Sequence, residues 1–190
     1  SSALADGGFL VGDLCFKVDR TVNGVPFMLT DHIDRLYRSL KYVRMDALMT
    51  ASEMMGLVIE GISRASYNLE NVGEFSMRQV VTRGAVDLFD DPAPTVLLNT
   101  GEQSFWYADL YDIGMAGGIS KTRAYSPQSL DPKVKHYSRM NFVLAHQEVH
   151  DMEPGAWPIL LDDRGNIAEG NGQNVFIVTD GVIRTPTDYA

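Results

Sequence analysis

The sequence predicts an α+β fold in two domains, and three observations support this prediction. Segments typical of strands and of helices are both present, but they do not alternate strictly along the chain. The length of 190 residues suits one large domain or two small ones. A segment rich in Gly, Ser and Pro, "MAGGISKTRAYSPQSLDP", interrupts the pattern. We predict a small N-terminal α/β domain over residues 1–115, a linker over 116–124, and the start of a β-rich second domain over 125–190.

The first half carries clear signals for four strands and two helices. "GDLCFKVDRTVNGVPFML" predicts two strands joined by an Asn-Gly turn. "TDHIDRLYRSLKYVRM" predicts a helix, because its apolar residues recur at spacings of three and four, and Thr30 or Asp31 can cap its start. "TASEMMGLVIEGISRAS" opens with the capping-box pair Thr50 and Glu53 and predicts a second helix. "FSMRQVVTRG" and "PTVLLNT" predict two further strands.

The second half is predicted to hold one helix among short strands. A short strand is expected around Ile119. "WPILLDDRGNIAEG" and "NVFIVTDGVIRTP" predict consecutive hairpins, with turns at "DDRGN" and "TDG". One face of the predicted helix collects four apolar residues, namely Phe142, Ala145, Val149 and Met152.

The composition and the charge exclude several classes of protein. Apolar residues make up 45% of the chain and charged residues 22%, as in ordinary soluble globular proteins. The net charge of -9 argues against a nucleic-acid backbone as the main partner. No apolar run approaches the roughly 20 residues that span a bilayer, and the N-terminus lacks the pattern of a signal peptide. We therefore expect no nucleic-acid partner and no membrane partner.

The single cysteine, Cys15, excludes a disulfide framework within the chain. It fits a reducing compartment, so we expect a cytoplasmic protein. Its apolar neighbours in "LCF" favour a buried structural role over that of a nucleophile.

The two lysines of "DPKVKH" have two interpretations. Lys133 and Lys135 alternate with Val134, so an extended segment would place both on one face. Edge strands often carry solvated lysines, which favours an ordinary structural role. The chemical interpretation is that a partly buried lysine amine forms a Schiff base with a carbonyl compound. From the residues alone, the two lysines are interchangeable.

Three histidines, His136, His146 and His150, invite a metal-site interpretation, because the last two lie four residues apart on the predicted helix. The residues between them do not form a metalloprotease motif, and no third ligand candidate is nearby. We therefore expect no metal. The glycines of "AEGNGQNVF" lie between strands rather than before a helix, so they are only a weak nucleotide-binding signal.

Three segments, taken together, resemble the class IV (fold-type IV) pyridoxal-phosphate aminotransferases, the family of the branched-chain and D-amino-acid aminotransferases. "DHIDRL" resembles the helix motif whose arginine holds the cofactor phosphate. "SLDPKVK" and "NFVLAHQEVHD" resemble the segment that carries the Schiff-base lysine. "LLDDRGNIAEGNGQNVFIVTDGVIRTP" resembles the most diagnostic signature of the family. The resemblance covers nearly the whole chain and implies pyridoxal 5'-phosphate (PLP) as cofactor and a homodimer.

The resemblance also implies roles for individual cofactor-binding residues. Lys135, and not Lys133, aligns with the lysine that forms the internal aldimine and then acts as general base. Arg35 aligns with the phosphate-binding arginine. Glu169 aligns with the carboxylate that keeps the pyridine nitrogen protonated, so that the ring accepts electrons. Asn174 is expected to shape the loop around the ring.

For the substrate pocket, the resemblance implies Phe16 as an aromatic residue and Arg78 as the arginine of branched-chain enzymes. Many relatives carry a tyrosine shortly after the lysine, whereas the aligned position here is Arg139. The D-amino-acid enzymes carry an arginine–histidine pair where this chain has "AVDLFDD", which argues against that specificity. Family members also continue beyond the position of Ala190, so the resemblance implies that the second domain is incomplete here.

The function that the resemblance implies is transamination between an amino acid, with branched-chain L-amino acids favoured, and a 2-oxo acid. The alternatives are an (R)-selective amine transaminase, a D-amino-acid transaminase and an enzyme like aminodeoxychorismate lyase. An alternative of another class is a non-catalytic fragment or binding module that keeps the fold.

Overall fold

The computed structural model describes residues 3–68, 73–85 and 93–187. The chain forms two compact units. The first comprises Ser1–Phe105 with Val134–Ser138, and the second comprises Trp106–Lys133 with Arg139–Ala190. The predicted linker, residues 116–124, falls inside the second unit, where part of it forms a strand. No helix of the described ranges is both long enough and apolar enough to cross a membrane.

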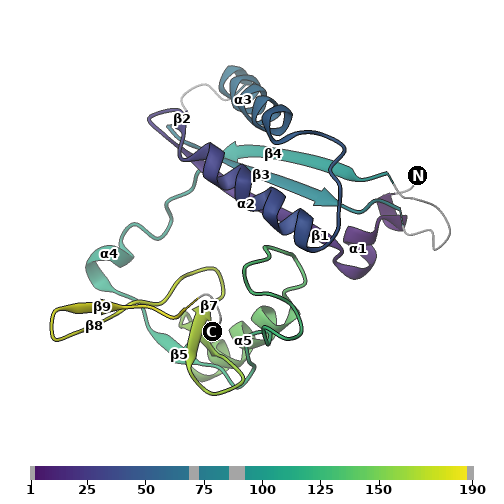
Figure 1. The fold of residues 1–190 in the computed structure, drawn as a ribbon. Helices are drawn as coiled ribbons and strands as arrows, with labels where there is room; N and C mark the ends of the chain where they lie inside the picture. Colours follow the sequence, from purple (N-terminus) through teal and green to yellow (C-terminus); the bar gives the residue numbers. More distant parts are fainter. Residues whose placement is uncertain (1–2, 69–72, 86–92, 188–190) are drawn as a thin grey trace. The chain divides into compact units, whose positions relative to one another are not determined.

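The first unit is built on a four-stranded antiparallel sheet with the order β2-β1-β3-β4 (Figure 1). The strands are β1 (Leu14–Val22), β2 (Val25–Pro26), β3 (Phe75–Thr82) and β4 (Thr95–Glu102). The predicted hairpin turn is confirmed, because Asn23 and Gly24 have φ values of 53° and 74°. A two-residue type I′ turn requires positive φ at both central positions.

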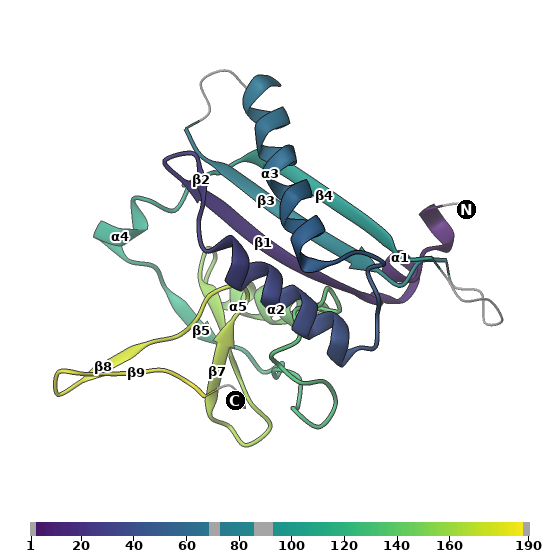
Figure 2. The same cartoon turned by 45° about the horizontal axis from the view of Figure 1, so that its top comes forward.

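Two helices, α2 (Leu29–Tyr42) and α3 (Ala51–Asn68), cover one face of this sheet (Figure 1, Figure 2). The predicted capping box of α3 is confirmed. The Thr50 N–H donates to the Glu53 carboxylate at 2.7 Å, and the Glu53 N–H donates to the Thr50 hydroxyl at 3.2 Å. The apolar core lies between the helices and the sheet, and its most deeply buried members are Cys15, Ile33, Leu36, Met54, Met77 and Val81.

The start of α2 differs from the prediction that Thr30 or Asp31 caps it. The helix begins at Leu29, after Met28 in the left-handed conformation, and no side chain caps its first turn. Both predicted caps therefore lie inside the first turn, where the charge of Asp31 is favourable at the positive end of the helix dipole.

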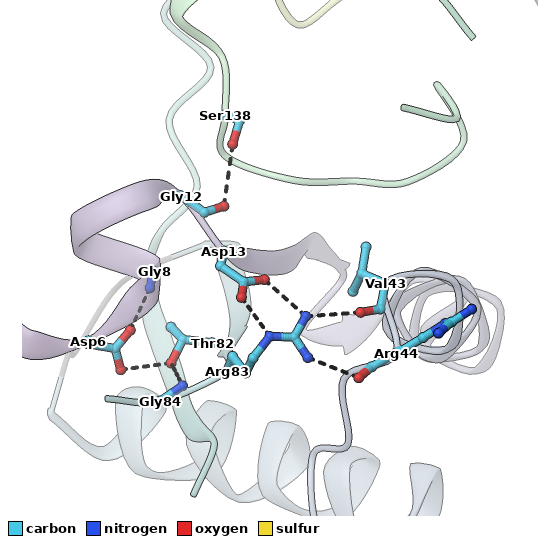
Figure 3. Close-up of polar contacts among 10 residues, drawn as sticks. All are labelled: Asp6, Gly8, Gly12, Asp13, Val43, Arg44, Thr82, Arg83, Gly84 and Ser138. Carbon is cyan, nitrogen blue, oxygen red and sulfur yellow. Dashed lines mark hydrogen bonds and ion pairs between the residues drawn. The ribbon is translucent and has the colours of Figure 1, made fainter. Parts of the chain in front are cut away.

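The N-terminal residues form two short helices that the sequence did not predict, η1 (Ala3–Ala5) and α1 (Gly7–Val11). Asp6 caps α1, because its carboxylate accepts the Gly8 N–H at 2.7 Å (Figure 3). The same carboxylate accepts the Thr82 hydroxyl at 2.8 Å, which ties α1 to the end of β3.

The second unit packs one long helix, α5 (Met140–Met152), on a three-stranded sheet of order β5-β6-β7. Its other elements are α4 (Leu110–Ile113), β5 (Gly117–Ile119), β6 (Trp157–Leu161), β7 (Ile167–Gly170), β8 (Ile177–Thr179) and β9 (Val182–Arg184). The β6–β7 and β8–β9 hairpins confirm the prediction from the sequence.

The apolar face of α5 is shorter than predicted. Phe142, Ala145 and Val149 are buried, but Met152, in the last turn, is 63% exposed. Helix and sheet approach closely at Gly118 of β5, where an added Cβ would lie 2.7 Å from a methyl group of Val149. The strand therefore needs glycine at this position.

Candidate functional site

The segment Val134–Ser138 is held in the first unit by main-chain contacts on two sides of Lys135. On one side, the Phe16 N–H of β1 donates to the Lys135 carbonyl at 3.0 Å. On the other side, the Lys135 N–H donates to the Ser39 hydroxyl of α2 at 3.4 Å. The backbone of Lys135 is therefore fixed between a strand and a helix that lie far earlier in the chain.

The Lys135 side chain joins an aromatic cluster on the face of the sheet opposite α2 and α3, which we call the open face. Its Nζ lies 4.9 Å from the centroid of the Phe16 ring, and that ring stacks on Tyr137 at 3.9 Å. The Arg78 guanidinium lies 5.9 Å from the centre of the Tyr137 ring. Phe16 and Val18 are two residues apart on β1 and therefore share a face. Arg78 pairs with Val18 across the ladder, so Arg78 lies on the same face as Phe16. The structure thus brings together Lys135, Phe16 and Arg78.

Tyr137 is the member of this cluster that the sequence analysis missed. An extended backbone places residues i and i+2 on one face, so the spacing of Lys135 and Tyr137 contained the signal. The resemblance implied a tyrosine near the lysine, but at the position of Arg139 and not at that of Tyr137. Tyr137 and a neighbouring part of the open face also line a hollow of about 570 Å³, together with Phe9, Leu14 and Val80.

Lys133 and Lys135 do not share a face of an extended segment, so that prediction was wrong. Lys133 lies in a turn, and its N–H donates to the Asp131 carboxylate at 2.9 Å. Its side chain is exposed and belongs to the second unit, whereas Lys135 is half-buried in the first. The structure therefore separates two lysines that periodicity alone left interchangeable.

Arg35 is exposed on α2, one turn before Ser39. Its carbonyl accepts the Ser39 hydroxyl at 3.1 Å. Its positive charge reaches Lys17 and His32 and lowers the pKa of each. Burial is the main cause that lowers the pKa of His32; Lys17, Arg35 and Lys135 lower it further, and Asp31 raises it.

Beneath α2, the helix-facing side of the sheet buries a polar cluster that the sequence analysis also missed. Lys17 and Asp19 of β1 are 6% and 3% exposed, and Gln79 of β3 is fully buried. The Nδ1 atom of His32 lies 3.5 Å from the Asp19 carboxylate. Within the described residues, neither Asp19 oxygen nor either amide atom of Gln79 meets hydrogen-bond geometry. Lys17 and Asp19 alternate with Phe16 and so share the face of the core, which was the available signal.

Burial dominates the ionisation of this cluster. It raises the pKa of Asp19 to about 6, against the opposing effects of Gln79 and Lys17. It also lowers the pKa of His32 and, with the help of Arg35, that of Lys17. An ion pair would shift Asp19 and His32 in the opposite directions, so at neutral pH a neutral imidazole lies beside the carboxylate.

Arg83 fastens the end of the sheet to α2 (Figure 3). Its guanidinium binds the Asp13 carboxylate through two nitrogens, with Nε–Oδ2 at 2.6 Å and Nη2–Oδ1 at 3.3 Å. It also donates to the carbonyls of Val43 and Arg44, both at 2.9 Å. Carbonyls at a helix C-terminus lack partners within the helix, so Arg83 satisfies them and anchors α2 beside β1.

In the second unit, Glu169 lies half-buried in the middle of β7 and pairs with Leu160 of β6. The loop after β7 folds back on the strand, because the Gly170 N–H donates to the Gln173 carbonyl at 2.8 Å. Asn174 follows as an exposed residue. This turn fixes where the chain leaves the strand that carries Glu169.

Arg139 occupies the position where a tyrosine was expected. Its guanidinium lies 3.8 Å from the centre of the Phe142 ring, one turn along α5, and donates to the Asn171 carbonyl at 3.3 Å. Arg139 therefore supports the loop after β7 from the start of α5. The segment "AVDLFDD", on which the case against D-amino-acid specificity depends, lies largely outside the described residues.

The histidines do not form a metal site with other residues of the described ranges. No group of three or more His, Cys, Asp or Glu side chains there is arranged to hold a metal ion. The rings of His146 and His150 lie 6.1 Å apart on the exposed side of α5. His136 is not on the helix, and its ring nitrogen accepts the Ser138 N–H.

Comparisons with known proteins show what the chain is similar to. A "Putative branched-chain-amino-acid aminotransferase" of Methanocaldococcus jannaschii is 36% identical over 97% of the chain and 62% of its own length. An aminodeoxychorismate lyase of Bacillus subtilis is 26% identical over 96% and 61%. The "T.th." branched-chain amino acid aminotransferase, solved with N-(5'-phosphopyridoxyl)-L-glutamate, is 26% identical over 100% of the chain and 63% of its own, with a TM-score of 0.83.

The chain thus spans less than two thirds of the length of these relatives. The high TM-score confirms the mixed α/β, fold-type IV architecture that the sequence predicted. The family model described as "Amino-transferase class IV" matches residues 15–189. The chain therefore belongs to the class IV aminotransferase family.

Proposed function

We propose that the protein is a PLP-dependent aminotransferase that moves an amino group from an amino acid to a 2-oxo acid. The observation that carries this proposal is the environment of Lys135. Its backbone is fixed between β1 and α2, and its amine lies over the Phe16 ring. These contacts hold the amine in one place, as attachment of a carbonyl compound to a lysine requires. Membership of the family, and the relatives that are named as aminotransferases, support the same activity.

The residues of the first unit fit an anionic cofactor. Arg35 is exposed on α2 and Lys135 is half-buried beside the same helix, and the positive charge of these side chains attracts a phosphate group. Arg35 would hold the phosphate, Lys135 would attach the cofactor through its amine, and Glu169 and Asn174 would border the ring. When bound, PLP supplies an electron sink for the negative charge that develops at the substrate Cα.

The chain's own groups would then handle the proton. With the cofactor bound, the Lys135 amine would act as the general base that takes the proton from the substrate Cα, and it would then return that proton as a general acid. The Glu169 carboxylate would accept a hydrogen bond from the ring nitrogen and keep it protonated. The Phe16 ring, which stacks on Tyr137, would shield one side of the amine from water. Arg78 would face the substrate pocket.

We propose a branched-chain L-amino acid as the preferred donor, because the M. jannaschii relative and the "T.th." structure are both named for that class. The lyase alternative is supported by the B. subtilis relative. Half-reactions with L-leucine, D-alanine and (R)-1-phenylethylamine, together with an assay for pyruvate release from aminodeoxychorismate, separate these functions. A preference for D-alanine, or pyruvate release without transamination, would overturn the assignment.

Covalent trapping tests the central proposal. The purified protein is mixed with PLP, reduced with borohydride, digested and mapped by mass spectrometry. We expect a reduced adduct on Lys135 that is absent from Lys135→Ala and unchanged in Lys133→Ala, the matched control in the exposed turn. No adduct, or an adduct on Lys133 alone, would favour the non-catalytic alternative. Light scattering on the same samples tests the proposed homodimer.

A further inference from the structure

We infer that Ser39 is a positioning residue for Lys135, whose hydroxyl links the peptide N–H of Lys135 to the carbonyl of Arg35. This inference rests on the proposed function, in which Arg35 would bind the phosphate of the cofactor and Lys135 would bind its carbonyl carbon. Ser39 itself would touch neither the cofactor nor the substrate.

The hydrogen bonds of Ser39 define its direction of donation. Its hydroxyl donates to the Arg35 carbonyl at 3.1 Å, one helical turn earlier. A hydroxyl has one proton and two lone pairs, so the oxygen remains an acceptor for the Lys135 N–H, at 3.4 Å. Ser39 is only 3% exposed, so water does not readily substitute for either partner. One buried oxygen therefore connects the two residues of the site.

Other described hydrogen bonds of this segment lie on the β1 side. The Lys135 carbonyl accepts the Phe16 N–H at 3.0 Å, and Cys15 bridges His136. The Ser138 hydroxyl donates to the Gly12 carbonyl at 3.4 Å (Figure 3). Ser39 adds a hydrogen bond from α2, on the other side of Lys135, and it therefore resists rotation of the segment about the edge of β1. Such rotation would carry the Lys135 amine away from the Phe16 ring.

The substitution Ser39→Ala removes this anchor with little effect on packing. Alanine has the same volume less one oxygen atom, and it favours the helix more than serine does. The core of the unit, built from Leu36, Leu40 and their neighbours, is untouched. The matched control is Ser63→Ala, which replaces an exposed serine on α3. The variant Ser39→Thr retains a hydroxyl and tests for rescue.

Amide hydrogen exchange at Lys135, measured without cofactor, is the first readout. We expect exchange of this amide to rise roughly fivefold to tenfold in Ser39→Ala and to stay unchanged in Ser63→Ala, as for the loss of one hydrogen bond. The second readout is the rate of borohydride-trapped PLP addition to Lys135, which we expect to fall severalfold in Ser39→Ala and to recover in Ser39→Thr.

The outcomes separate failure of the inference from failure of the proposed function. Equal exchange in Ser39→Ala and Ser63→Ala overturns the inference, whatever the cofactor does. Faster exchange with an unchanged rate of trapping shows that Ser39 anchors the backbone without positioning the amine, and it also overturns the inference. If wild-type protein gives no adduct on Lys135, the proposed function fails and the positioning role fails with it, even where the exchange result holds.

Discussion

The two faces of β1 have opposite character, although neighbouring residues of the strand alternate between them. The helix-facing side presents Cys15, Lys17 and Asp19 to the core, and it buries two charged groups there. The open side presents Phe16 and Val18 next to Lys135 and Arg78. Under the proposed function, the comparison teaches that one face of the strand mainly serves stability and the other mainly serves chemistry. Substitutions on the helix side should change stability and its pH dependence, and those on the open side should change function.

The largest expected effect is loss of core packing on the helix side. Met77 is 2% exposed and pairs with Asp19 in the ladder. Met77→Ala leaves a cavity, so we expect the free energy of unfolding to fall by about 3 kcal/mol in urea denaturation. Val18→Ala, on the half-buried open side, is the control and should cost about 1 kcal/mol or less. Equal losses from the two variants would contradict the division between the faces.

The next effect concerns the pH dependence of stability, through Asp19. Its folded-state pKa, raised to about 6, exceeds the ordinary value near 4 of an unfolded chain. The folded protein therefore binds this proton more tightly, and the stability so gained is present below pH 4 and lost as pH rises through 6. We expect wild type to lose about 3 kcal/mol relative to Asp19→Asn between pH 4 and pH 7.

The Asp19 experiment compares urea unfolding of both proteins across that range. His32 and Lys17 are present in both, so to first order their own titration cancels in the difference. Asp34→Asn, which removes an exposed carboxylate of α2, is the matched control. A difference between wild type and Asp19→Asn that stays flat with pH would show that burial does not govern this carboxyl group.

The thiol of Cys15 reports on the closure of the same helix-facing side. Burial raises its pKa from the ordinary value of 9.0 to about 11, with a smaller effect from Asp13. The thiolate fraction at pH 8 is therefore roughly a hundredfold lower than in the unfolded chain, and labelling by an alkylating reagent should slow by at least that factor. Labelling of native protein as fast as that of urea-unfolded protein would mean that this face opens readily.

The smallest effect on stability is expected on the open side, at Arg78. Its side chain is exposed, and its described contact is with the face of the Tyr137 ring. Arg78→Gln should change the free energy of unfolding by less than about 0.5 kcal/mol. Under the proposed function it should raise KM for the amino donor severalfold, whereas Arg38→Gln on α2 should not. An unchanged KM would remove Arg78 from the substrate pocket.

Local signals predicted most of the fold. The Asn23-Gly24 turn, the Thr50–Glu53 capping box and the hairpins after Trp157 each depend on residues close together in the chain, and the structure contains all of them. The errors arose where a local rule was overridden by a backbone conformation that the sequence pattern does not indicate. Thr30 is a good capping residue, but the chain enters α2 through Met28 in a left-handed turn.

The site was harder to predict, because its geometry depends on contacts between distant segments. Periodicity would place Lys133 and Lys135 on one face of an extended segment, whereas in the structure Lys133 lies in a turn and Lys135 precedes the bridge of His136 with the edge of β1. The pairing of that edge with Cys15, and the Ser39 contact, leave no local pattern in the sequence. The alternation along β1 did indicate that Lys17 and Asp19 face the core. However, charged residues are almost never fully buried, which argued against predicting their burial.

The long-range docking of Val134–Ser138 also has a consequence for the order of folding. The hydrogen bond from Ser138 to Gly12 spans 126 residues, and that from Lys135 to Ser39 spans 96. Closing loops of this length slows the formation of a contact, and during synthesis the chain emerges from its N-terminus. We therefore expect the sheet and its two helices to form first, and the segment that carries Lys135 to dock afterwards on the edge of β1.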